Sequence, residues 1–411
     1  MRTVRALLVT FATLVACRES EVRPPDATPT LTATATATPT PTATGTATGT
    51  ATATATAPPT SLRPGPMPLI SLGVPAFATH SIQPPSAAVD ADYRTAWRSG
   101  HTPSADDPDA LALDLSRVPA EARAVVYSLW FNEAGYSYDT ADGHSYALPG
   151  DYAIQSNSAP GGGSPPASGW VTLAGRKGNT LSSGAHLLRL GGASWVRFVS
   201  TASAPRAAPM NVDTALQWAL YDAHAGLDGW KLVGDSITAN AMGHVATNDA
   251  FDQLVHRQVP ASPAFEMAGH GGWTSGNALA AIDAYLADFP GRYVGLALGT
   301  NDGDPAAYGA NMTRLIDRVL AAGKVPVLPT LPYTEEPGHV PVLPRLNAEV
   351  ARLYAAYGAR LVHGPDLWTL LRAGKATMFD RPTDLHPNAA GNAAIRQAWA
   401  DAMVRAVYRA P

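Results

Sequence analysis

The hydrophobic positions of the chain follow two different rhythms in its two main parts. Between Met67 and about His224, short segments alternate apolar and polar residues, as at Leu111–Leu115 and Trp195–Val199. Clusters of Gly, Pro, Asn and Ser separate these segments. Because alternation with a period of two places the apolar side chains on one face of a strand, this pattern predicts an all-β sandwich over residues 67–224.

In the later part of the chain, short apolar runs alternate with helical patterns. Runs such as Trp230–Val233 and Tyr293–Leu298 have the length of buried strands. Between such runs, apolar residues recur with the 3.6-residue period of a helix, for example over Met312–Leu320. A series of alternating strands and helices predicts a parallel sheet with helices on both faces, and hence an α/β domain over residues 225–411.

The first part of the chain shows neither rhythm. Arg2 and Arg5 precede a short apolar stretch that ends at Cys17, the only cysteine in the sequence. A basic start followed by an apolar stretch too short to span a membrane predicts a secretion signal over residues 1–17. Residues 18–66 are dominated by Thr, Ala and Pro and offer little apolar surface to bury, so we expect a disordered linker there.

The residues around Cys17 suggest where the protein is located. Leu14–Cys17 resembles the lipobox of bacterial lipoproteins, in which cleavage precedes a cysteine that carries lipid. The resemblance implies lipidation of Cys17 and an exported protein anchored to a membrane on the bacterial cell surface or in the periplasm. An ordinary signal peptide that happens to contain a cysteine is the alternative. A single cysteine also excludes disulfides and cysteine-ligated zinc from the folded part.

Charge and histidine spacing narrow the range of functions further. The formal net charge is −4, charged residues make up 15% of the chain, and no long basic run is present. These features give no support for nucleic-acid binding. The chain has 11 histidines. The ten other than His386 are scattered and show no spacing typical of metal ligands. We therefore expect no metal or other cofactor in catalysis.

Polar residues of the α/β domain follow its predicted strands, where open parallel sheets build their sites. Ser236 comes shortly after Trp230–Val233, and Asn301 shortly after Tyr293–Leu298. A serine hydroxyl becomes a good nucleophile when a base takes its proton, and histidine suits that task because its pKa lies near neutrality. These residue types predict nucleophilic catalysis by a serine, with a histidine as its general base.

Four sequence blocks in this domain resemble those of the SGNH, or GDSL, hydrolase family and follow the family's order. They are Gly234–Ile237, Ala268–Ser275, Gly299–Asp302 and Asp384–Asn388. The resemblance implies a flavodoxin-like, three-layer fold. It also implies a serine esterase that hydrolyses ester bonds through an acyl-enzyme, with Ser236 as nucleophile and His386 as general base.

The resemblance further implies which groups stabilise the oxyanion. Negative charge develops on the attacked carbonyl oxygen, so donors must already point at it. The family's donors correspond here to the backbone amides of Ser236 and Gly272 and the side chain of Asn301. Glycine allows close approach of the backbone. The neighbouring Trp273 could stack on a sugar ring or pack against its own loop, and both interpretations stay open at this point.

One position departs from the family pattern. The family's acid usually lies three residues before the histidine, and this chain has Thr383 there. Asp384 lies two residues before His386 and is the predicted partner of its imidazole. A Ser–His dyad is the main alternative, and Asp380 is a further candidate for the acid.

The predicted sandwich resembles the discoidin, or F5/8 type C, galactose-binding-like domain, which is a jelly roll. The matching residues include Val89–Trp97 and Trp195–Arg197. Within the first segment, Asp90, Asp92 and Thr95 resemble a turn that holds a structural calcium ion in many such domains. Oxygen ligands suit that hard cation. An ordinary hydrogen-bonded turn is the alternative.

Together these features predict a carbohydrate O-acetylesterase that acts on polysaccharide. The appended sandwich and the surface linker favour sugar over lipid, which is an argument by fold analogy. A lipase or general acyl esterase is the first alternative. A non-catalytic, cell-surface carbohydrate-binding protein is the second, and the complete set of Ser, Gly, Asn and His argues against it.

Overall fold

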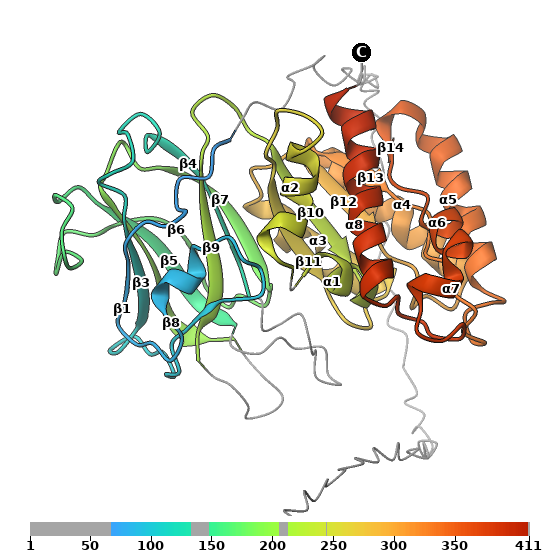
Figure 1. Ribbon diagram of the computed structural model, residues 1–411, viewed down its shortest axis with the longest axis horizontal. Helices are drawn as coiled ribbons and strands as arrows, with labels where there is room; N and C mark the ends of the chain where they lie inside the picture. Colours follow the sequence, from blue (N-terminus) through green and yellow to red (C-terminus); the bar gives the residue numbers. More distant parts are fainter. Residues whose placement is uncertain (1–66, 133–147, 205–212, 244, 410–411) are drawn as a thin grey trace, which may run out of the picture. The chain divides into compact units, whose positions relative to one another are not determined.

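The computed structural model describes residues 67–132, 148–204, 213–243 and 245–409, which all belong to one structural unit (Figure 1). The predicted signal peptide, the lipidation site at Cys17 and the linker lie outside the described residues. The predicted domain boundary falls between strand β9, which ends at Asp222, and strand β10, which begins at Gly229.

The earlier region consists of two antiparallel sheets, as predicted. The first has the strand order β1-β3-β8-β5-β6, with bounds Ala76–Ala78 (β1), Asp109–Asp114 (β3), Trp195–Ser203 (β8), Pro149–Asn157 (β5) and Val171–Arg176 (β6). The second has the order β2-β9-β4-β7, with bounds Trp97–Arg98 (β2), Ala215–Asp222 (β9), Val125–Phe131 (β4) and Ser183–Arg189 (β7). A short 3₁₀ helix, η1 (Pro85–Ala88), precedes β2.

The second of these sheets is buried on both of its faces. On β4, Val126 and Trp130 pack into a core that the two antiparallel sheets share. Tyr127 and Leu129 belong to a different core, together with residues of the α/β region such as Trp230. Strand β4 is therefore apolar along nearly its whole length because each of its faces meets another layer.

The later region contains one parallel sheet with the strand order β11-β10-β12-β13-β14. The bounds are Gly229–Gly234 (β10), Ala264–Gly269 (β11), Tyr293–Ala297 (β12), Val325–Leu328 (β13) and Val362–His363 (β14). The first strand of the sheet thus has the second strand on one side and the third on the other. This is the flavodoxin-like order that the sequence predicts, and the order reverses at β10.

Helices lie on both faces of the parallel sheet (Figure 1). Their bounds are Ser236–Met242 (α1), Phe251–His256 (α2), Ser275–Ala287 (α3), Pro305–Ala321 (α4), Leu343–Tyr357 (α5), Leu367–Ala373 (α6), Lys375–Met378 (α7) and Ala389–Met403 (α8). Helices α1 and α2 pack against α8, and α4 packs against both α3 and α5. Within the described ranges, none of these helices combines the length and the hydrophobicity needed to cross a bilayer.

Strand β11 forms the edge of the parallel sheet and packs against β4 and β7 of the sandwich. A buried polar link crosses this contact. The Lys231 ammonium lies 2.7 Å from a Glu266 carboxylate oxygen, and the Ser183 hydroxyl on β7 donates to the same oxygen over 2.8 Å. Burial lowers the pKa of Lys231, and the Glu266 carboxylate opposes that shift. Buried charges need partners. The ion pair of Lys231 and Glu266 in the α/β region therefore depends in part on a hydrogen bond from Ser183 in the sandwich.

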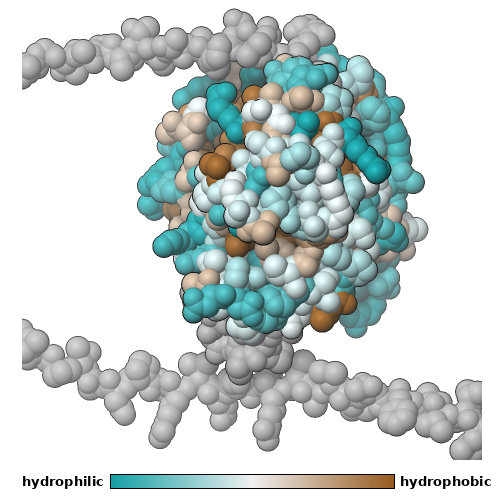
Figure 2. Space-filling view, turned by 90° about the vertical axis from the view of Figure 1, so that its left-hand side faces the viewer, coloured by the Kyte–Doolittle hydropathy of each residue, from teal (hydrophilic) through white to brown (hydrophobic). Residues whose placement is uncertain are grey.

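The outer surface on the sandwich side differs from this buried contact. Figure 2 shows hydrophobic residues scattered among hydrophilic and neutral ones on the described part of that face. Scattered apolar side chains are ordinary on soluble proteins. The broad apolar surface of the sandwich is therefore the one that faces the α/β region.

Candidate active site

The carboxyl ends of three neighbouring strands build the candidate site. Gly234, the last residue of β10, pairs with Gly269 of β11 and Ala297 of β12. A side chain on Gly234 would collide with Thr238 of α1, and one on Gly269 would collide with the backbone of Ala239. The two glycines therefore let α1 start close to the edge of the sheet, and the segments after all three strands leave at the same edge.

Ser236 is the first residue of α1. The preceding Asp235 caps this helix, and its carboxylate accepts a hydrogen bond from the Ile237 backbone N–H over 3.0 Å. Burial raises the pKa of Asp235 to about 6, although such hydrogen bonds oppose the shift. The Ser236 hydroxyl oxygen lies 2.8 Å from Nε2 of His386. The structure thus brings together the predicted nucleophile and the predicted base, which lie 150 positions apart in the sequence.

His386 lies in the segment between α7 and α8. Burial lowers the pKa of His386, and the nearby charge of His339 lowers it further. A lowered pKa keeps the imidazole neutral at neutral pH, and only a neutral ring nitrogen can accept a proton. Nε2 is the ring nitrogen that faces the Ser236 hydroxyl and is therefore the one placed to take its proton.

Gly272 and Asn301 come from the segments that follow β11 and β12. Gly272 has φ +72°, in the left-handed region that favours glycine. The Asn301 side-chain amide donates to the Trp273 carbonyl oxygen over 2.9 Å, which ties the Asn301 segment to the Gly272 turn. Trp273 stacks on His270 with ring centroids 3.9 Å apart, so it packs against its own loop.

Two further residues hold these segments in place, and sequence reasoning assigned them no role. The Asp302 carboxylate accepts from the Ser275 backbone N–H over 2.9 Å and from its hydroxyl over 2.5 Å, joining the end of β12 to the start of α3. His270 is buried and lies 2.6 Å from the Tyr285 hydroxyl. Burial lowers the pKa of His270 to about 4. The position of Asp302 directly after Asn301 was the available signal.

The predicted acid has a different partner from the one expected. The Asp384 carboxylate accepts from the Arg381 backbone N–H and from its guanidinium Nε, each over 2.9 Å. Asp380 accepts from the Asn388 side chain over 3.2 Å. In the part of the chain that the structure describes, neither carboxylate is hydrogen-bonded to His386. The observed contacts are those of a Ser–His pair, which is the alternative that the sequence left open.

The turn considered for calcium is closed by its own hydrogen bonds. One Asp90 carboxylate oxygen accepts from the Thr95 hydroxyl over 2.7 Å, and the other accepts from the Asp92 backbone N–H over 2.9 Å. The Asp92 carboxylate accepts from Arg94 Nε over 2.8 Å. The Gln217 side chain on β9 donates to the backbone carbonyl oxygens of Asp92 and Thr95. Calcium at this turn stays a prediction.

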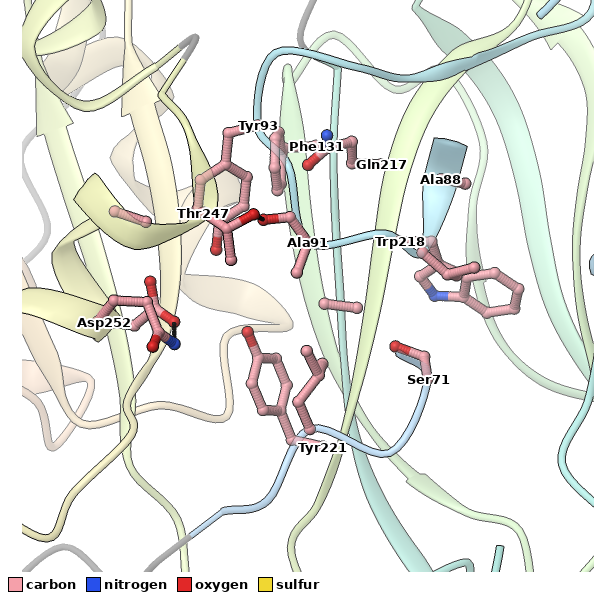
Figure 3. A pocket seen from close by; sticks show the side chains of 15 residues that line it. Ser71, Ala88, Ala91, Tyr93, Phe131, Gln217, Trp218, Tyr221, Thr247 and Asp252 are labelled. Atoms are coloured by element: carbon pink, nitrogen blue, oxygen red, sulfur yellow. Dashed lines mark hydrogen bonds between the residues drawn. The ribbon is translucent and has the colours of Figure 1, made fainter. Parts of the chain in front are cut away.

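A pocket lies between the sandwich and the α/β region (Figure 3). Tyr221 comes from β9, whereas Thr247 and Asp252 come from the segment that contains α2. The Thr247 hydroxyl donates to the Ala91 carbonyl oxygen over 2.8 Å, and burial raises the pKa of Asp252. Its lining contains none of the predicted catalytic residues, so the pocket belongs to the contact between the regions.

The fold and this arrangement together define a class of protein. A serine at a strand-to-helix turn is hydrogen-bonded to an imidazole. A glycine turn tied to an asparagine follows the neighbouring strands. These are the groups that a serine hydrolase uses for catalysis. Residues 232–394, less than half of the chain, match the family described as GDSL-like Lipase/Acylhydrolase. This part of the chain is a GDSL/SGNH hydrolase domain, and the protein is an enzyme of that type. None of the curated proteins matches the chain.

Several solved structures resemble parts of the chain. A psychrotrophic esterase, EstA, from Pseudoalteromonas sp. is 22% identical with a TM-score of 0.36, covering 43% of this chain and 97% of its own. A lipase/acylhydrolase from Enterococcus faecalis is 19% identical with a TM-score of 0.36, covering 43% and 95%. Chitosan-binding module 1 of a chitosanase/glucanase from Paenibacillus sp. IK-5 is 18% identical with a TM-score of 0.28, covering 37% and 98%.

Proposed function

We propose that the protein is a serine esterase in which Ser236 and His386 are the reacting pair. The observation that carries the proposal is the 2.8 Å contact between the Ser236 hydroxyl and His386 Nε2. Ser236 Oγ forms a bond to the ester carbonyl carbon while Nε2 takes its proton. The intermediate then collapses, and the alcohol leaves with that proton from His386. Water, activated by the same imidazole, hydrolyses the acyl-enzyme.

The oxyanion formed in each step requires fixed donors. We assign the backbone amides of Ser236 and Gly272 and the side-chain amide of Asn301 to this role. The Asn301 amide carries two N–H groups, and the Trp273 carbonyl oxygen accepts from this amide. One of them therefore anchors the side chain, and the other is available for the substrate oxygen.

The pairing of Asp384 supports a Ser–His pair as the working unit. Its carboxylate is bound to Arg381, and its carbonyl oxygen accepts from the Thr334 hydroxyl over 2.8 Å. In this proposal Asp384 holds the loop that carries His386. The triad, with Asp384 as acceptor of the imidazole Nδ1 proton, is the alternative.

The test of this site combines covalent labelling with substitution. A serine-directed phosphonate should add its mass to Ser236, and Ser236→Ala should lose at least about a thousandfold in turnover of an aryl acetate. Ser262→Ala is the matched control, because Ser262 is also hydrogen-bonded to a histidine ring in the same domain, at 3.1 Å. Retention of more than roughly a tenth of the turnover by Ser236→Ala would exclude Ser236 as nucleophile.

For the substrate, we propose acetyl esters of polysaccharides. Support comes from the attached sandwich, which resembles a galactose-binding-like jelly roll, and this is an argument by analogy. Acetate release from an acetylated glycan should exceed hydrolysis of emulsified long-chain esters. The reverse ranking would favour the lipase or general acyl esterase. Binding of glycans by Ser236→Ala, together with no esterase activity in the unaltered protein, would favour the non-catalytic binding protein.

We also propose that lipid on Cys17 tethers the enzyme to a bacterial membrane through the linker at residues 18–66. The support is the sequence around Cys17. Cys17→Ser should release the full-length protein into the soluble fraction with unchanged hydrolysis of small esters. Continued membrane fractionation of this variant would contradict the lipoprotein.

A structural calcium ion at Asp90, Asp92 and Thr95 is proposed as part of the sandwich. Carboxylate and carbonyl oxygens gather there, and they suit calcium. Added Ca²⁺ should raise the melting temperature of the protein, and Asp90→Asn should remove that increase. An equal increase in both proteins would leave the hydrogen-bonded turn as the better account.

A further inference from the structure

We propose that the sandwich contains a site for a divalent transition metal, best matched by Zn²⁺, formed by His80, His101 and Asp107. The site is separate from the esterase chemistry and from the turn at Asp90–Thr95. The His80 ring follows β1, the His101 ring follows β2, and Asp107 lies just before β3. The segment after β1 and the connection between β2 and β3 therefore converge at one end of the sandwich.

The candidate ligand atoms of His80, His101 and Asp107 all lie within 4.8 Å of one another, close enough to share one metal ion. The two imidazole rings stack with their centroids 3.8 Å apart. The Nε2 atoms of His80 and His101 lie 3.7 and 3.3 Å from carboxylate oxygens of Asp107. Bonds of about 2.0–2.2 Å to a tetrahedral zinc ion place ligand atoms roughly 3.3 Å apart. The rings are stacked with an interplanar angle of 21°, so both must turn out of the stack for their Nε2 lone pairs to point at one ion.

Asp109 provides the second layer of such a site. One of its carboxylate oxygens lies 3.1 Å from Nδ1 of His80 and 2.9 Å from Nδ1 of His101. If both Nδ1 atoms donate to this carboxylate, the two Nε2 atoms are the nitrogens that can bind a metal. Metal-binding histidines almost always donate their other N–H to a carboxylate or carbonyl in this way.

In the part of the chain that the structure describes, the buried carboxylate of Asp109 lacks a partner for one of its two oxygens. Its side chain is fully buried, and its second carboxylate oxygen has no hydrogen-bond partner among the described residues. A buried carboxylate with one oxygen left without a hydrogen bond is incompletely satisfied. A divalent cation bound on the far side of the two rings would stabilise its negative charge.

The backbone around these residues is held before any ion binds. The Thr79 backbone N–H donates to the Ala110 carbonyl oxygen over 3.0 Å, and the Ala110 N–H donates to the Thr79 hydroxyl over 2.9 Å. These bonds continue the pairing of β1 with β3 and place His80 opposite Asp109. The Ser104 backbone N–H donates to the Asp107 carbonyl oxygen over 3.0 Å, which fixes the loop that carries Asp107.

The ligand set selects among metals. Two imidazole nitrogens and one carboxylate suit Zn²⁺, whereas Ca²⁺ prefers a shell of oxygen ligands. Asp107 has 65% of its side chain exposed, so ions can reach the site from solvent. Three protein ligands leave one position for water.

The test uses the full-length protein after treatment with a chelator. Titration calorimetry should show one equivalent of Zn²⁺ bound, unaffected by millimolar Ca²⁺, and Co²⁺ should give the visible absorption of a tetrahedral site. His101→Gln should weaken Zn²⁺ binding at least about a hundredfold, and Asp109→Asn about ten- to a hundredfold. His224→Ala is the matched control, because Nδ1 of His224 lies 2.5 Å from a carboxylate oxygen of Asp222, outside the cluster.

Thermal melting separates loss of the site from loss of the fold. Zn²⁺ should raise the melting temperature of the unaltered protein and of His224→Ala but leave that of His80→Ala unchanged. The proposal is overturned if Zn²⁺ binds the unaltered protein and a His80→Ala/His101→Ala double variant equally, or binds neither. Turnover of aryl esters by the chelator-treated protein should be unchanged, because the cluster is separate from Ser236.

Discussion

The parallel sheet and the second antiparallel sheet are both buried on two faces, but for different reasons. The parallel sheet is covered by helices of its own region. The sheet of β2, β9, β4 and β7 is covered on one side by the other antiparallel sheet and on its other side by the α/β region. The proposed catalytic residues lie in the region of the parallel sheet. The sheet of β2, β9, β4 and β7 packs against that region and supports it. Variants that separate these two roles sharpen the comparison.

The largest effect is expected at the buried link between the regions. Lys231→Met leaves Glu266 as a buried carboxylate without its cation, which should reduce the free energy of unfolding by about 3–5 kcal/mol. Urea unfolding, followed both by tryptophan fluorescence and by esterase activity, measures this change. Both signals should be lost in one transition, because the two regions share a core.

The double variant Lys231→Met/Glu266→Leu is the control for this prediction. Removing both charges should restore most of the lost stability, since a hydrophobic pair can replace a buried ion pair. Ser183→Ala should cost only about 1 kcal/mol, because it removes one hydrogen bond. A loss of less than about 1 kcal/mol in Lys231→Met would mean that water reaches Glu266.

The next effect should change catalysis and leave stability nearly unaltered. Asn301→Ala removes one donor to the oxyanion and should lower kcat roughly a hundredfold with little change in KM. Steady-state kinetics on an aryl acetate measures it. Asn311→Ala is the matched control, since Asn311 donates to Ser275 in the same neighbourhood and should not touch the substrate. A change in KM alone would instead indicate a role in substrate binding.

A smaller effect tests whether Asp384 is part of the catalytic unit. If it holds the loop through Arg381, Asp384→Asn should reduce kcat by no more than about tenfold, because packing and local charge are all that change. A triad would lose up to about four decades through the wrong imidazole tautomer. Thr383→Ala, at the position where the family has its acid, is the control and should be close to neutral. A loss near the larger value would establish the triad.

The smallest effect concerns pH. Because burial and the charge of His339 lower the pKa of His386, kcat/KM should fall as His386 becomes protonated, with a midpoint below the ordinary histidine value of about 6.5. His339→Gln removes a positive charge, which makes protonation of His386 easier. The midpoint should then rise by roughly 0.2–0.7 of a pH unit. An unchanged midpoint would show that burial alone sets this pKa.

The sequence was most informative where chemistry requires particular residue types beside strand ends. Ser236 and Asn301 could be proposed for that reason, whereas His386 was identified through the family resemblance. The structure brings Ser236 and His386 into contact. The partner of Asp384 could not be predicted, because a loop carboxylate selects its partner by local geometry, and here Arg381 lies in the same turn. The burial of both faces of β4 was also missed, although Val125–Phe131 is apolar at every position except Ser128, a pattern typical of strands covered on both faces.

The histidines of the sandwich show the same limit more clearly. His80 and His101 are neighbours only because β1 and β2 end at the same end of the sandwich, on different sheets. Their separation in the sequence therefore carries no information about their contact. A linear motif can describe ligands on one helix or one loop, but not ligands brought together by pairing of distant strands.

The double burial of the second sheet has a consequence for how this architecture can be inherited or re-engineered. Binding domains that fold independently of their enzymes can be exchanged between enzymes by recombination. Here, the isolated sandwich would expose Tyr127 and Leu129 on β4, and the isolated hydrolase region would expose β11. Either fragment would then have an exposed apolar surface, which favours aggregation. Any transplant of this sandwich onto another enzyme must carry β11 and its neighbours with it, so the two regions should be inherited as a pair.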